Sequence, residues 1–132
     1  MKFSIKQKIL LMGLLVSAAS FADLATDISR ASDEQILVAG KKMAEALAQT
    51  APSQIDKTTV LRGGIFSKGT KTLIYQYDSS IPLDPSKMYT LVGRQMCSDP
   101  IKFSFMKRGI RYRHDYTSPV GLQTVTIGVK DC

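Results

Sequence analysis

The chain has 132 residues, a length that suits one small domain, and eighteen Lys and Arg against eleven Asp and Glu give a net charge of +7. Without the amino-terminal Lys2, Lys6 and Lys8, which we expect to be removed, fifteen basic residues face eleven acidic ones, a net charge of +4. This mild excess argues against a nucleic-acid partner, because nucleic-acid-binding domains concentrate positive charge in a stripe.

Residues 1–22 have the three parts of an export signal. Three lysines precede an uncharged apolar run over residues 9–16, and small residues then lead to a cleavage site after Ala22, with cleavage after Ala19 left open. The apolar run is too short to cross a bilayer core of about 30 Å as a helix, so no transmembrane anchor is expected. The mature chain is therefore predicted to be a single domain over residues 23–132 that folds outside the cytosol.

The first predicted helix covers residues 32–50. Residues 23–31 carry no clear pattern and are predicted to be an irregular lead. Ser32 then begins a Ser-Asp-Glu-Gln run with the form of a capping box, and Pro52 ends the helical pattern. Apolar residues recur at helical spacing on one side of this helix: Ile36, Leu37, Met43, Ala44, Leu47 and Ala48.

Two β-rich runs follow, over residues 58–66 and 71–78. The four residues between them include a glycine, which predicts a β-hairpin. The Gly63-Gly64 pair predicts a bulge or bend in the first strand. A phosphate-cradling loop is disfavoured, because the glycine, lysine and helix start that such loops need do not follow.

Two further helices have the same start signal. Asp84-Pro85 predicts an N-cap and first helical residue, and that helix carries Cys97 on its last turn. Asp99-Pro100 repeats the signal for a short helix that Gly109 ends.

Residues 110–117 alternate apolar and polar side chains, and a second alternating run continues from residue 124 to the end of the chain. No βαβ crossover is evident. We therefore predict an α+β domain with an antiparallel sheet of about four strands, helices on one face and the order α-β-β-α-(α)-β-β.

Cys97 and Cys132 are the only cysteines. An even count in a small exported domain predicts a disulfide, which should stabilise the fold by roughly 4 kcal/mol. A reactive thiol at Cys97 is the less favoured alternative, because exported thiols usually oxidise.

Four short motifs together form a recognisable set: Tyr75-Gln76-Tyr77, Cys97-Ser98-Asp99-Pro100, Gly109-Ile110-Arg111-Tyr112 and the final Asp131-Cys132. Over residues 33–132 the chain resembles a set of poorly characterised small exported proteins of Gram-negative bacteria. In outline it also resembles the disulfide-bearing pilotins, lipoproteins that guide secretin subunits of type II secretion. No cysteine follows the apolar run here, so we expect no amino-terminal lipid. Neither resemblance supplies a catalytic residue.

His114, the only histidine, is the first candidate for a general base or metal ligand. A metal site needs three or four ligands, and strand alternation points the neighbouring Asp115 to the opposite face. We therefore favour a half-buried histidine on a tyrosine-rich face. The carboxylates are scattered and no nucleophile motif is present, so no catalytic residue, metal or cofactor is expected.

The densest charged feature is a run of five cations without an acid over residues 102–113, which we call the basic segment: Lys102, Lys107, Arg108, Arg111 and Arg113. A solvated face is the usual explanation for such a run, and a partner-binding site is the alternative. As a binding site it would suit an acidic protein surface or an anionic envelope polymer.

These observations predict an exported binding or accessory protein of the bacterial cell envelope, periplasmic or secreted, with a link to a secretion apparatus as one option. The expected partner is another envelope protein with an acidic surface. A small exported enzyme and an inhibitor of a cell-wall hydrolase are the alternatives. The inhibitor is disfavoured because lysozymes tend to be cationic, as this chain is.

Overall fold

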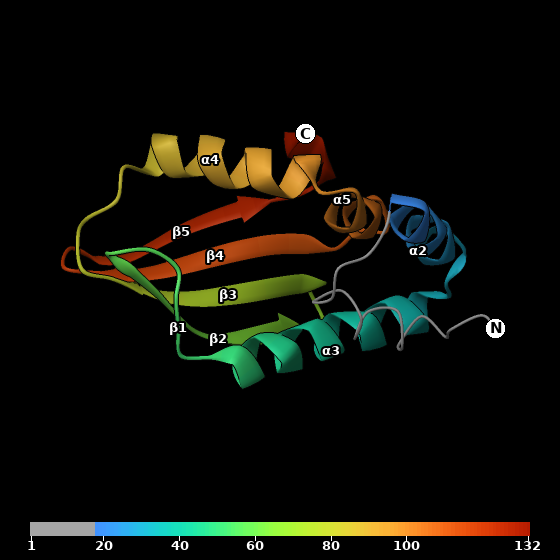
Figure 1. Ribbon diagram of the computed structural model, residues 1–132, viewed down its shortest axis with the longest axis horizontal. Helices are drawn as coiled ribbons and strands as arrows, with labels where there is room; N and C mark the ends of the chain where they lie inside the picture. The colour runs from blue at the N-terminus through green and yellow to red at the C-terminus, as the bar shows by residue number, and fades with distance from the viewer. Residues whose placement is uncertain (1–17) are drawn as a thin grey trace.

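The computed structural model describes residues 18–132, which form an α+β domain (Figure 1). The predicted α+β class is confirmed. The predicted export signal lies mostly outside the described residues, so its cleavage stays a prediction. No helix among residues 18–132 is both long enough and apolar enough to cross a membrane. The elements, in chain order, are α2 (Ala18–Arg30), α3 (Asp33–Thr50), β1 (Ser53–Gln54), β2 (Thr59–Ser67), β3 (Thr72–Ser79), α4 (Pro85–Ser98), α5 (Pro100–Lys107), β4 (Arg111–Ser118), β5 (Gly121–Ile127) and the 3-10 turn η2 (Val129–Asp131).

The sheet has five strands in the spatial order β1-β2-β3-β4-β5. All neighbouring strands are antiparallel except β3 and β4, which pair in parallel. The prediction of a purely antiparallel sheet of about four strands is therefore wrong. The long connection through α4 and α5 returns the chain to the end of the sheet where β3 begins, as parallel neighbours require.

The prediction of an irregular lead over residues 23–31 is also wrong. Residues 18–30 form α2, which packs against α5 and buries Leu24 and Ile28 in the core. Among residues 22–30, only Leu24 and Ile28, one helical turn apart, are buried, so the periodic signal is too short to recognise.

The predicted helix starts are confirmed by their hydrogen bonds. The Gln35 amide donates to Ser32 Oγ at 3.1 Å, and the Ser32 amide donates to Gln35 Oε1 at 2.8 Å, completing the capping box. Asp84 and Asp99 accept backbone N–H groups at the starts of α4 and α5. Gly109 follows α5 with a φ of +93°, a conformation that favours glycine.

The predicted hairpin and bulge are present in β2 and β3. The register between these strands shifts between Leu61 and Gly63. Gly64 permits the close approach of α3, because a Cβ atom at this position would lie 2.7 Å from Leu47 Cβ. The strand β2 and the helix α3 therefore pack closely at Gly64.

The helices cover one face of the sheet. The inward side chains of β3, β4 and β5, including Leu73, Tyr112 and Ile127, belong to one core cluster with residues from all four helices of residues 18–132. Figure 1 shows α3 running along β2 and α4 along β5, with α2 and α5 together at one end. The opposite face carries polar groups such as the Arg113–Asp115 ion pair.

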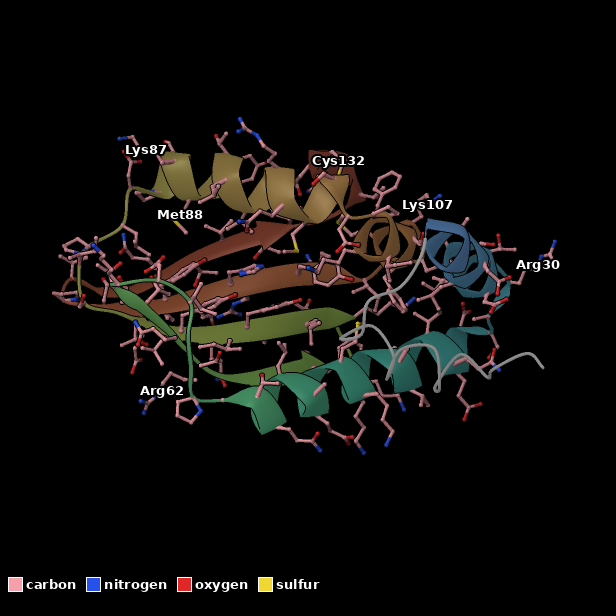
Figure 2. The ribbon with its side chains drawn as sticks, viewed as in Figure 1. Arg30, Arg62, Lys87, Met88, Lys107 and Cys132 are labelled. Atoms are coloured by element: carbon pink, nitrogen blue, oxygen red, sulfur yellow. A yellow bond between two sulfur atoms is a disulfide. The ribbon has the colours of Figure 1, made fainter. Side chains whose placement is uncertain are left out.

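The chain leaves β5 at Ile127, earlier than predicted, and ends in η2. The predicted disulfide is present, with the Cys97 and Cys132 sulfurs 2.11 Å apart and their Cα atoms 5.5 Å apart. It fixes the end of the chain to the last turn of α4 (Figure 2).

Candidate functional site

A groove of about 550 Å³ lies between one side of α3 and the strand β2; we call it the edge groove. Its floor and walls are largely apolar, and charged side chains stand at its rim. It is lined by Glu34, Leu37, Val38, Lys41, Ala44, Glu45 and Ala48 of α3 and by Gly64, Ile65, Phe66 and Lys68 on the strand side.

The strand side of the edge groove has an open hydrogen-bonding edge. The two-residue β1 pairs only with Val60 and Leu61, so residues 63–67 of β2 have β3 on one side and no strand of the described chain on the other. These five residues include no charge and no proline, the usual protections of a sheet edge. Ile65 at this edge is 50% exposed.

Charges at the rim of the edge groove nearly cancel. Glu34 and Lys41 stand on α3, where Glu45 forms an ion pair with Lys42 at 3.4 Å, and Lys68 stands beyond the end of β2. The edge groove therefore offers apolar contact and backbone hydrogen bonds without a strong field of either sign.

His114 lies in a row of aromatic rings on the inner face of the sheet. Its ring stacks on Tyr75 with centroids 4.4 Å apart, and its Nδ1 atom lies 3.1 Å from the Tyr77 hydroxyl. Only 3% of the residue is exposed, so it is more deeply buried than predicted. Its Nε2 atom has no hydrogen-bond partner among the described residues, and burial, with a smaller contribution from Lys102, lowers the pKa of His114 to about 4.

The carboxylate beside His114 in sequence is turned away, as predicted. Asp115 lies on the other face, where it accepts hydrogen bonds from Arg113 at 2.7 Å and from Thr124 at 2.9 Å. Within residues 18–132, no three His, Cys, Asp or Glu side chains are grouped to hold a metal ion. The arrangement around His114 is that of a packed aromatic core.

The basic segment is spread over several surfaces. Lys102 forms an ion pair with Asp99 at 3.5 Å on α5, and Arg113 is paired with Asp115 on the outer face of the sheet. Lys107 extends over the Phe103 ring, 5.2 Å from its centroid, at the end of the molecule near α2 (Figure 2). Its members are neighbours in sequence, but Lys102, Lys107 and Arg113 contact different partners on different elements.

Arg108 is held by contacts within the molecule. Its Nη1 donates to the carbonyl oxygens of Ile28 and Ala31 at 2.7 Å each, and its Nη2 lies 3.1 Å from Asp33 Oδ1. These contacts tie the end of α5 to the turn between α2 and α3. The sequence alone does not distinguish Arg108, which links these elements, from the exposed cations near it in the chain.

We expect Arg108→Ala to lower the free energy of unfolding by about 2 kcal/mol, because it leaves two backbone carbonyls without their charged donor. The matched control is Lys107→Ala, which removes an adjacent, exposed cation that contacts only the Phe103 ring among the contacts described above, and it should lower stability by no more than about 1 kcal/mol. Urea denaturation of both variants tests this. Equal losses of stability in the two variants would show that Arg108 contributes no more to the fold than Lys107 does.

Sequence reasoning did not identify the edge groove. Leu37 and Ala48 belong to the apolar side predicted for the first helix, but nothing in the sequence indicates that they face a groove. The available signal was the uncharged run 63–67, combined with more apolar positions on α3 than a buried stripe needs.

Comparisons with known proteins show the fold. No family model and no curated protein matches the sequence. One similar structure is that of a Pseudomonas aeruginosa protein inferred to be secreted, with 17% identity and a TM-score of 0.63 over 77% of this chain and 98% of that one. Another is the pilotin EpsS of the Vibrio vulnificus type 2 secretion system, with 13% identity and a TM-score of 0.66 over 76% of this chain and 94% of that one. The resemblance predicted from the sequence motifs is thereby confirmed, and at these identities what the three proteins share is the fold.

Proposed function

We propose that this protein is an exported accessory protein of the bacterial cell envelope that works by binding another envelope protein in the edge groove. The observation that carries the proposal is the open strand edge beside an apolar helix wall. Grooves of this kind bind peptide segments, because the backbone supplies hydrogen bonds and the wall supplies apolar contact.

Two further observations support the location and the partner. The Cys97–Cys132 disulfide fits an oxidising compartment, periplasmic or extracellular. The fold is shared with a protein inferred to be secreted and with a pilotin. A component of a secretion apparatus is therefore the first partner to test.

Binding without catalysis is part of the proposal. His114 is the best-placed titratable group, yet it is enclosed by tyrosines and its neighbour Asp115 is turned to the other face. A general base has to reach the proton it removes. Neither side chain lines the edge groove.

An acidic partner surface remains a second proposal, which rests on the exposed members of the basic segment. Lys107 and Arg111 are exposed, whereas the other three cations are held by acids or by backbone carbonyls. If Lys107 and Arg111 bind the partner, replacing both by glutamine should weaken binding, and added salt should weaken it further.

Site-specific photocrosslinking in intact cells tests the edge groove. A photoreactive residue in place of Val38, on the α3 wall, should give a covalent adduct with one envelope protein. The matched control is the same residue in place of Leu122, which is 61% exposed on the far edge strand β5. No adduct from position 38, or equal adducts from both positions, would contradict the edge groove as the binding site.

A further inference from the structure

We infer that the partner enters the edge groove as an added β-strand, an extended and largely uncharged apolar segment that runs antiparallel to β2 along residues 63–67. This inference rests on the proposed function, since it concerns the same groove. It specifies the conformation and the chemistry of the partner segment.

The geometry of β1 supports strand addition. Ser53 pairs with Leu61 and Gln54 with Val60 in antiparallel register, and the residue before Ser53 is Pro52, which has no N–H to continue the ladder. A segment that runs in the same direction as β1 would occupy the open edge that lies beyond Ser53, the first residue of β1. At about 3.4 Å per residue, the open stretch is about 17 Å long, enough for a typical strand.

The two sides of an added strand would meet different surfaces. Successive side chains point to opposite faces of a sheet, so alternate residues would contact the α3 wall formed by Leu37 and Val38. The residues between them would lie beside the exposed side of Ile65 on the outer face. Both neighbours are apolar, which favours apolar residues at alternate positions of the partner.

The charges at the rim decide against a strongly charged partner. Two acids, Glu34 and Glu45, and two bases, Lys41 and Lys68, line the edge groove, so an acidic or a basic segment is repelled by half of them. Binding should therefore depend little on salt, unlike binding at Lys107 and Arg111.

Charge also disfavours a second copy of this chain as the occupant. Antiparallel pairing of β2 with itself, centred on Ile65, would place Arg62 of each copy opposite Lys68 of the other. Like charges directly opposite each other on neighbouring strands are destabilising. An edge strand from a different protein avoids this repulsion.

The test uses a displayed library of short random peptides, selected on the intact exported protein. Enriched peptides should alternate apolar residues and carry few charges. Adding the synthetic form of one such peptide should protect amide protons of residues 63–67 from exchange, and methylating its backbone nitrogens should weaken binding by about tenfold or more. Raised salt should leave the affinity nearly unchanged.

Ile65→Lys supplies the protein-side test, with Leu122→Lys as its matched control. Ile65 on β2 is 50% exposed and Leu122 on β5 is 61% exposed, and both side chains lie on the outer face of the sheet. Both variants should therefore fold. Ile65→Lys should weaken peptide binding by about tenfold or more, because lysines on edge strands commonly prevent the addition of another strand. Leu122→Lys should leave peptide binding unchanged.

Four results would overturn strand addition: enriched peptides with helical spacing of apolar residues, enriched acidic peptides, no amide protection at residues 63–67, or equal effects of the two lysine variants. If position 38 still crosslinks to an envelope protein in that case, the proposed function stands and only the strand is wrong. If position 38 gives no adduct, the proposed function itself fails. An adduct between two copies of this chain would show that the edge groove binds a second copy, and not a different envelope protein.

Discussion

Replacing Cys97 and Cys132 by serine is expected to lower the free energy of unfolding by about 4 kcal/mol, because the disulfide closes a loop between residues 35 positions apart. For a domain of this size that corresponds to a fall of about 20 °C in the melting temperature. The fold should persist, since Asp131 still accepts hydrogen bonds from the Tyr89 hydroxyl at 2.5 Å and the Gly128 amide at 2.8 Å. Thermal and urea denaturation measure the change.

Two controls separate the loss of the crosslink from damage caused by the substitutions. A reductant should shift the native protein to the melting temperature of the double-serine variant and should leave that variant unchanged. Alkylation of the native protein followed by mass spectrometry should find no free thiol. Two alkylated cysteines without reductant would show that the disulfide does not form.

The local signals in the sequence were reliable because each depends on a few adjacent residues. Ser32, Asp84 and Asp99 cap helices through hydrogen bonds to backbone groups two or three positions away. The bulge between Leu61 and Gly63 likewise lies next to the Gly63-Gly64 pair that predicts it. Nothing distant is needed to specify such features.

The direction of β4 could not be predicted in the same way. Whether it runs parallel or antiparallel to β3 depends on the path of residues 80–110, which hold two helices whose packing partners are far away in sequence. The sequence predicted both helices but not that α4 would run back along the sheet. The short β1 exists because Ser53 and Gln54 meet β2, which no property of these two residues indicates.

The candidate site shows the same limit. The basic segment was the most visible feature of the sequence. It spans a helix, a turn and a strand, so its side chains lie on different elements and contact different partners. Arg108 becomes a tether and Arg113 an ion-pair partner. The edge groove is formed by Val38 and Ile65, which belong to different elements and become neighbours only when α3 packs on β2.

Acidification is expected to weaken the fold through His114. Its pKa is lowered from 6.5 to about 4 in the folded protein, chiefly by burial, so between these two values the unfolded chain binds a proton that the folded chain does not. His114 therefore lowers the free energy of unfolding by about 3 kcal/mol as the pH drops from 6.5 to 4. Below pH 4 this residue causes no further change in stability. Urea denaturation across this pH range measures the loss.

His114→Gln isolates this contribution from those of the carboxylates. Asp56 and Asp131 also have a pKa lowered by hydrogen bonds, and Lys102 and Asp115 act on the pKa of His114, so the whole protein has other acid-dependent terms. The variant keeps these groups and removes the imidazole, so it should be less stable at pH 7 through the lost ring stacking on Tyr75. On acidification, the variant should nevertheless lose about 3 kcal/mol less stability than the native protein loses. Parallel profiles for the two proteins would mean that His114 is already protonated, or hydrated, in the folded state.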